Sequence, residues 1–119
     1  MQPDDRIRIR HMLDAAETAI DFISGKSRAD LDTDQMLLFA LVRAVEIIGE
    51  AATRVSELTR ASANAVPWAL IVAMRHRLIH AYFDINRDIL WTTVTEELPM
   101  LVETLRSEIG TVSVVDRDH

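Results

Sequence analysis

Two arginines, two histidines and a tyrosine follow an apolar run in the second half of the chain: Arg75, His76, Arg77, His80 and Tyr82. Arginine keeps its positive charge at physiological pH, and histidine exchanges a proton near neutrality. An arginine can bind a phosphodiester and stabilise the extra negative charge of its transition state. A histidine can move a proton between a ribose 2′-hydroxyl and the leaving 5′-oxygen. The set therefore indicates phosphate chemistry on RNA that requires no metal.

Helical periodicity places Arg75 and Tyr82 on an apolar stripe. On a wheel of about 100° per residue, Tyr82 returns to within about 20° of Arg75. A guanidinium on such a stripe is costly unless it is paired or lines a wet site. We therefore take Arg75 as the functional centre. A purely structural interpretation stays open, in which Arg75 only pairs with Glu46 or Glu50 of a neighbouring helix.

His76 and His80 have the four-residue spacing of helical zinc ligands, but no glutamate follows His76 and the chain has no cysteine. A third ligand is not evident nearby, so the sequence predicts neither a metal site nor a cofactor. Supporting polar roles are assigned to His76, Arg77, Glu46 and Glu50. For the two glutamates, the alternative is a solvated ladder of ion pairs with the arginines at 43 and 54.

The spacing of Arg75 and His80 predicts a homodimer. Five residues correspond to about 140° around an ideal helix, so one straight helix presents the two side chains poorly to a single phosphate. Two copies about a two-fold axis could combine an arginine from one chain with a histidine from the other. The apolar residues on more than one side of the segment 34–58 favour the same arrangement.

Composition restricts the classes of protein that this chain can represent. It has 119 residues, 49% of them hydrophobic, with three glycines and three prolines, which favours a helical domain. The net charge of −6 argues against a protein that coats nucleic acid non-specifically. The charged N-terminus does not resemble a secretion signal, and the sequence has no long apolar run, so we expect a cytoplasmic protein without a membrane span.

Apolar spacing predicts helices at about 4–24, 34–58, 67–83 and 87–109. Asp34 and Asn86 are expected to cap the second and fourth helices. Pro99 should kink or restart the last helix, and Gly110 should end it. These elements predict an all-α, up-and-down four-helix bundle over residues 1–109, followed by a flexible tail at 110–119.

The chain resembles the HepT type of HEPN-domain proteins over most of its length, from about residue 4 to 109. Its central motif has Arg75, four residues, His80, one residue and Tyr82. Five flanking segments are also similar to that family: Arg10-His11-Met12-Leu13-Asp14-Ala15-Ala16, residues 43–52, Val66-Pro67-Trp68, Ile89-Leu90-Trp91 and Leu98-Pro99. One departure is His76, where the family commonly has asparagine, so the pH dependence of the site can differ.

The resemblance implies a HEPN-like helical bundle that dimerises and acts as a metal-independent ribonuclease toxin, with Arg75 and His80 as its catalytic pair. The expected substrate is single-stranded RNA, for example exposed parts of tRNA. It also implies a partner, a nucleotidyltransferase antitoxin of the MntA type, which would transfer AMP to Tyr82 as in type VII toxin–antitoxin pairs. Added phosphate beside Arg75 would occupy the substrate's phosphate site. The alternative is a non-catalytic nucleotide-binding or scaffold dimer that serves the same partner.

Overall fold

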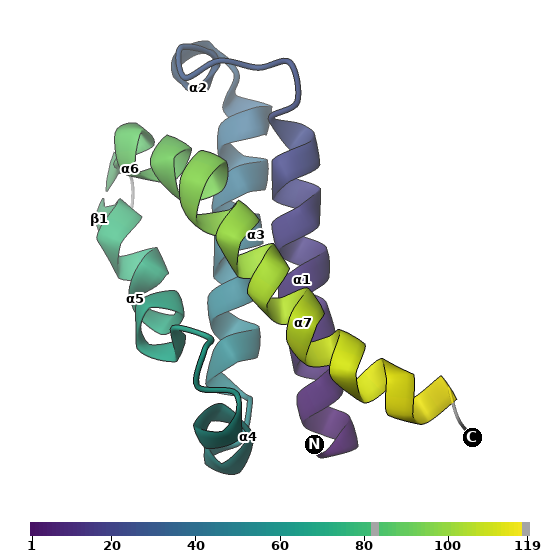
Figure 1. The fold of residues 1–119 in the computed structure, drawn as a ribbon. Coiled ribbons are helices and arrows are strands. Elements are labelled where there is room, and N and C mark those ends of the chain that lie inside the picture. Colours follow the sequence, from purple (N-terminus) through teal and green to yellow (C-terminus); the bar gives the residue numbers. More distant parts are fainter. Residues whose placement is uncertain (82–83, 118–119) are drawn as a thin grey trace.

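The computed structural model describes residues 1–81 and 84–117, without the side chains of 80, 81 and 111–117. Two long antiparallel helices, α1 (Pro3–Phe22) and α3 (Gln35–Thr53), lie side by side (Figure 1). Helix α5 (Trp68–Leu78) packs against α3, and α7 (Leu98–Arg117) crosses α1 diagonally. Three short helices connect them: α2 (Asp30–Thr33), α4 (Glu57–Ser62) and α6 (Arg87–Thr92). The predicted all-α bundle is confirmed.

Aliphatic side chains at helical spacing form the core between these helices. Its fully buried members include Ile9 and Met12 of α1, Leu41, Val45 and Ile48 of α3, and Leu98 and Leu105 of α7. Asp34 caps α3 as predicted, because its side chain accepts a hydrogen bond from the Leu37 N–H at 3.0 Å. Helix α3 therefore has a capped start and a buried core face, and α5 packs against it.

The segment predicted as one helix at 34–58 is two helices. Helix α3 ends at Thr53, and Ser56 starts α4 by accepting the Thr59 N–H at 3.3 Å. Asp5 of α1 holds the same corner, since its carboxylate accepts the N–H and the hydroxyl of Ser56 at 2.8 and 2.6 Å. The sequence predicted one helix here because apolar periodicity continues past Thr53.

The segment predicted as a third helix at 67–83 is also shorter. Helix α5 ends at Leu78, and Ile79 turns to an extended conformation with φ −115° and ψ 102°. Strand β1 (Ile79–Ala81) then pairs antiparallel with β2 (Asp84–Ile85). Ile79 is β-branched and prefers this extended geometry. His80 therefore belongs to a strand, and its expected angle to Arg75 on a continuous helix is wrong.

The last helix is joined from pieces, as the proline predicted. Helix α6 is followed by a π-helical turn, η1 (Thr93–Glu97), and then by α7. Pro99 has no N–H to donate to the preceding turn, and the wider π turn lies directly before it. The expected end at Gly110 is wrong, because the backbone of α7 continues to Arg117. Flexibility of residues 110–119 stays a prediction.

Asn86 starts α6 as predicted, and it yields a first test. Its side-chain oxygen accepts the Ile89 N–H at 3.0 Å. Replacing Asn86 with alanine is expected to lower the free energy of unfolding by about 1 kcal/mol. Urea denaturation measures this change, with Asn64→Ala as the control, because Asn64 is exposed and its side chain has no hydrogen bond within the described residues. Equal losses in both variants would contradict the capping role.

Candidate functional site

The position of the motif is set by the packing of α5 on α3. Trp68, Ile71, Met74 and Leu78 are buried at intervals of three and four residues. The indole N–H of Trp68 donates to the Ala63 carbonyl at 3.1 Å, which fixes the start of the helix. The end of α5, with Arg75, His76 and Arg77, is thereby held in place beside α3 and η1.

Arg75 is not buried on the apolar stripe, which corrects the wheel analysis. Its neighbour Met74 is buried, but 48% of the Arg75 side chain is exposed. A helical wheel gives the direction in which a side chain leaves the backbone, whereas a long arginine carries its charged end to solvent. The guanidinium is accordingly accessible, as a substrate-binding group must be.

Arg75 has an ion-pair partner on α3. Its Nε donates to Oε2 of Glu46 at 3.1 Å, and the Glu46 side chain is 25% exposed. Neither terminal nitrogen of Arg75 has a hydrogen-bond partner within the described residues. Each of these nitrogens carries two N–H groups. The guanidinium therefore keeps the edge that a phosphate needs, while Glu46 orients it.

Glu50, the other predicted neighbour of Arg75, has a different partner. It accepts from the Arg43 guanidinium of its own helix at 3.3 Å. Both residues line a small cavity between α1 and α3, together with basic residues that the sequence analysis did not assign: Arg8, His11 and Arg54. In the sequence, the only sign of this cluster is the helical spacing of its basic residues within two separate segments. The packing of α1 against α3 brings the two segments together.

His76 and Arg77 continue around the end of α5. His76 is exposed and faces solvent. Arg77 turns to the opposite side from Glu46 and makes two bonds to the Glu97 carboxylate of η1, at 3.2 and 3.3 Å. This pair was not predicted. Within the described residues, the Arg77 Nε and the Thr93 hydroxyl are buried without partners, and both residues line a cavity of about 380 Å³. Arg77 therefore ties α5 to the π turn.

Of the two remaining motif residues, the structure describes only the backbone of His80. The His80 backbone lies in β1, directly after the end of α5. Its side chain, and Tyr82 as a whole, lie outside the described residues. The catalytic role of His80 and the modification of Tyr82 therefore stay predictions. The structure brings Arg75 and Glu46 together, whereas Glu50 pairs with Arg43 and Arg77 pairs with Glu97.

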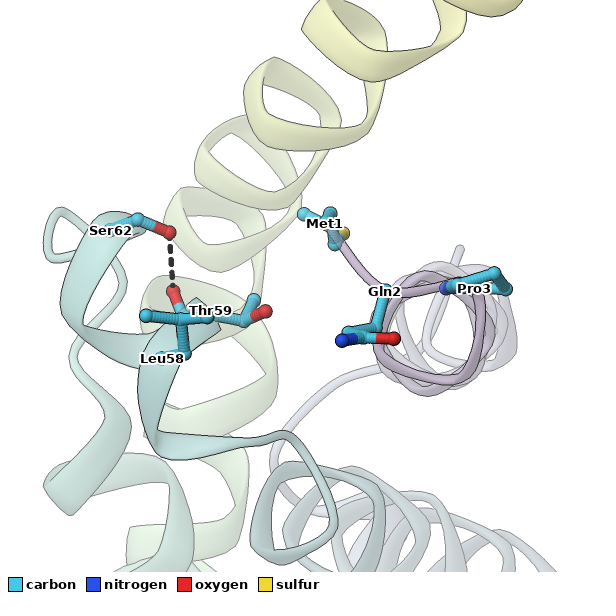
Figure 2. Close-up of a pocket in the computed structure, with 6 residues that line it drawn as sticks. All are labelled: Met1, Gln2, Pro3, Leu58, Thr59 and Ser62. Atoms are coloured by element: carbon cyan, nitrogen blue, oxygen red, sulfur yellow. Dashed lines mark hydrogen bonds between the residues drawn. The ribbon is translucent and has the colours of Figure 1, made fainter.

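Another cavity, of about 430 Å³, lies between the start of α1 and α4, and no residue of the motif lines it. Figure 2 shows Met1, Gln2 and Pro3 on one side and Leu58, Thr59 and Ser62 on the other. The Ser62 hydroxyl donates to the Thr59 carbonyl, and the Thr59 hydroxyl donates to Asp5. Among the described residues, no ionisable side chain lines this cavity, and its polar side chains are those of Gln2, Thr59 and Ser62.

Membrane spans and metal clusters are both absent from the described part of the chain. No helix there has the length and apolar character required to cross a bilayer. In the same residues, no group of three or more histidine, cysteine, aspartate or glutamate side chains is arranged to hold a metal ion.

Comparisons with known proteins give a family match and several relatives. Residues 12–108 match the model of a family described as "Ribonuclease HepT-like". A protein of Caldanaerobacter subterraneus subsp. tengcongensis, named "Putative RNase", is 38% identical over 82% of this chain and 88% of its own length. A "Probable ribonuclease HepT" of Thermococcus cleftensis is 38% identical over 76% of this chain and 86% of its own. No solved structure gives a significant match. The chain belongs to the HepT-like ribonuclease family.

Proposed function

We propose that this protein is a metal-independent endoribonuclease and acts as the toxin of a type VII-like toxin–antitoxin pair. The observation that carries the proposal is the Arg75 guanidinium. It is half exposed, oriented by Glu46 through Nε, and unpaired at both terminal nitrogens within the described residues. It also lies at the end of α5, directly before the strand that contains His80.

The reaction follows from the chemistry of these two residues. The His80 imidazole removes the proton from a ribose 2′-hydroxyl, and the 2′-oxygen attacks the adjacent phosphorus. The bond from phosphorus to the 5′-oxygen breaks, and a protonated imidazole returns a proton to that oxygen. Arg75 binds the non-bridging oxygens as their negative charge increases. The products are a 2′,3′-cyclic phosphate and a 5′-hydroxyl.

The proposed active species is a homodimer with its site at or beside the interface. Support comes from α3, where Met36 is 84% exposed and Phe39 is 59% exposed, one helical turn apart. Large apolar side chains gathered on a surface favour contact with another protein surface. A second copy would cover them, and it would let Arg75 of one chain act with His80 of the other.

The proposed regulator is a nucleotidyltransferase antitoxin of the MntA type that transfers AMP to Tyr82. Tyr82 is seven residues after Arg75 in the sequence. A phosphate attached there would supply the anion that Arg75 otherwise takes from RNA, and it would block the substrate. Co-expression with the antitoxin should add the mass of one or more AMP groups to wild type and none to Tyr82→Phe. Such AMP transfer without any RNA cleavage would instead support the scaffold alternative.

RNA cleavage by the purified protein tests the proposed enzyme. Wild type is expected to cut single-stranded RNA in the presence of EDTA, leaving ends that a kinase labels at the 5′-hydroxyl. The Arg75→Met/His80→Ala double variant, purified in the same way, controls for contaminating nuclease. Failure of wild type to cut mixed single-stranded RNA and tRNA would overturn the proposal.

A further inference from the structure

A small basic cavity lies between α1 and α3, apart from the motif. Its volume is about 160 Å³, and four basic side chains line it beside one acidic residue, Glu50. The basic residues are Arg8 and His11 of α1, Arg43 of α3, and Arg54, which follows the end of α3. The floor is apolar and comes from Ile47 and Ala51. We call this group of residues the α1–α3 basic cavity.

Helical spacing explains why these side chains meet. Arg8 and His11 are three residues apart and share one face of α1. Arg43 and Glu50 share one face of α3 at an interval of seven residues, and Arg54, directly after the end of the helix, follows Glu50 by four. The helices α1 and α3 lie side by side and antiparallel (Figure 1), and residues of the two faces line one cavity. The cavity is thus a product of the core packing.

The charges in this cavity do not balance. Glu50 pairs with Arg43, and Asp14 lines the adjoining cavity with Arg43 and His11. Neither the Arg8 nor the Arg54 side chain has a hydrogen-bond or ion-pair partner within the described residues. Two unpaired guanidinium groups that line one small cavity repel each other unless an anion lies between them. In a chain of net charge −6, this local excess of positive charge favours an anionic ligand.

The position of the α1–α3 basic cavity relative to Arg75 follows from helical angles on α1 and α3. Glu17, which pairs with Arg106 of α7, is about 180° around α1 from Arg8, so the cavity faces away from α7. On α3, Glu46 is about 60° around the helix from Arg43. The exposed ridge of α3 therefore separates the α1–α3 basic cavity from the Arg75–Glu46 pair. A helix with its side chains is about 10–12 Å wide, which an extended nucleic acid strand spans easily.

We infer that the α1–α3 basic cavity binds a phosphate of the RNA backbone, on one side of the phosphodiester that Arg75 contacts. This inference rests on the proposed ribonuclease function and adds a second contact to it. Arg8 and Arg54 bind the phosphate oxygens, and Arg43 exchanges between Glu50 and the strand. The contact supplies affinity without reading the base, because it involves only phosphate. It explains how an acidic protein retains a local attraction for RNA.

Salt-dependent RNA binding tests the inference. The protein carries His80→Ala to prevent cleavage, and the probe is a fluorescent single-stranded RNA of mixed sequence. The Arg8→Gln/Arg54→Gln variant is expected to bind about tenfold more weakly at low salt, with a salt slope smaller by about 0.7 because one phosphate contact is lost. The matched control is Arg10→Gln, which is exposed on α1 and about 200° around the helix from Arg8. Thermal melting checks that each variant is folded.

The outcomes separate this inference from the proposed function. Unchanged affinity and salt slope in the double variant would overturn the inference, even if wild type cuts RNA. Weaker RNA binding by the double variant would support the cavity, even if wild type cuts nothing. Titration with ATP is the remaining arm of the experiment. ATP binding that is lost in the double variant, with RNA affinity unchanged, would assign the cavity to a free nucleotide and overturn the inference.

Discussion

Replacing Arg75 with methionine is expected to lower kcat/KM for RNA cleavage by about 10²–10³-fold, the usual effect of removing one donor from a developing oxyanion. Stability should change little, because the Arg75–Glu46 pair is half exposed and such pairs contribute about 0–1 kcal/mol. Initial rates on a labelled RNA and thermal melting measure the two quantities. The matched control is Arg106→Met, which removes another ion pair between helices, Arg106–Glu17, away from the site.

Glu46→Gln completes this experiment. The substitution keeps the size of the side chain but removes the charge that competes with phosphate for Arg75. KM should fall by up to about fivefold, because an exposed pair is worth about 1 kcal/mol at most. If Arg75→Met cuts RNA as fast as Arg106→Met, then Arg75 serves only to pair with Glu46, and the structural interpretation is correct.

The largest expected effect on stability comes from Asp5, far from the motif. Its side chain is 4% exposed and accepts three hydrogen bonds, from the N–H and hydroxyl of Ser56 and from the hydroxyl of Thr59. Asp5→Ala leaves these donors without partners, at about 1–3 kcal/mol each when buried. We therefore expect a loss of about 3 kcal/mol or more, and a melting temperature lower by about 10–20 °C. Asp4→Ala, at the exposed neighbouring position, is the control.

The same carboxylate predicts a loss of stability in acid. Burial acts to raise the pKa of Asp5, but the hydrogen bonds from Ser56 and Thr59 outweigh it and hold the pKa below its ordinary value. A lowered pKa in the folded state means that the stabilisation is complete above the unfolded pKa of about 3.9. It is lost as the pH falls through the folded value. Denaturation of wild type and Asp5→Asn between pH 2 and pH 6 measures it, and we expect a flatter profile for the variant. Parallel profiles would contradict the role of Asp5.

Local signals predicted much of the fold correctly. Asp34 and Asn86 both cap helices, because a cap depends on a side chain and a backbone N–H three residues away. Pro99 predicted the interruption of the last helix, because a missing N–H has the same effect in any fold. The ends of the second and third helices were wrong. There, apolar periodicity continues past Thr53 and Leu78, whereas Ser56 is held by Asp5 of α1 and Ile79 pairs with Ile85 of β2.

The sequence by itself determined the class of fold and the chemistry available to this protein. Apolar spacing made it helical, and the arginine, histidine and tyrosine of the motif indicated phosphate chemistry, because residue types and short spacings are local properties. The tertiary structure decided which charges meet. It paired Arg75 with Glu46 rather than Glu50, joined Arg77 to Glu97, and gathered Arg8 and Arg54 into one cavity. These residues are up to 46 positions apart in the sequence, as Arg8 and Arg54 are. Only the packing of α1, α3 and α5 around one core brings them together.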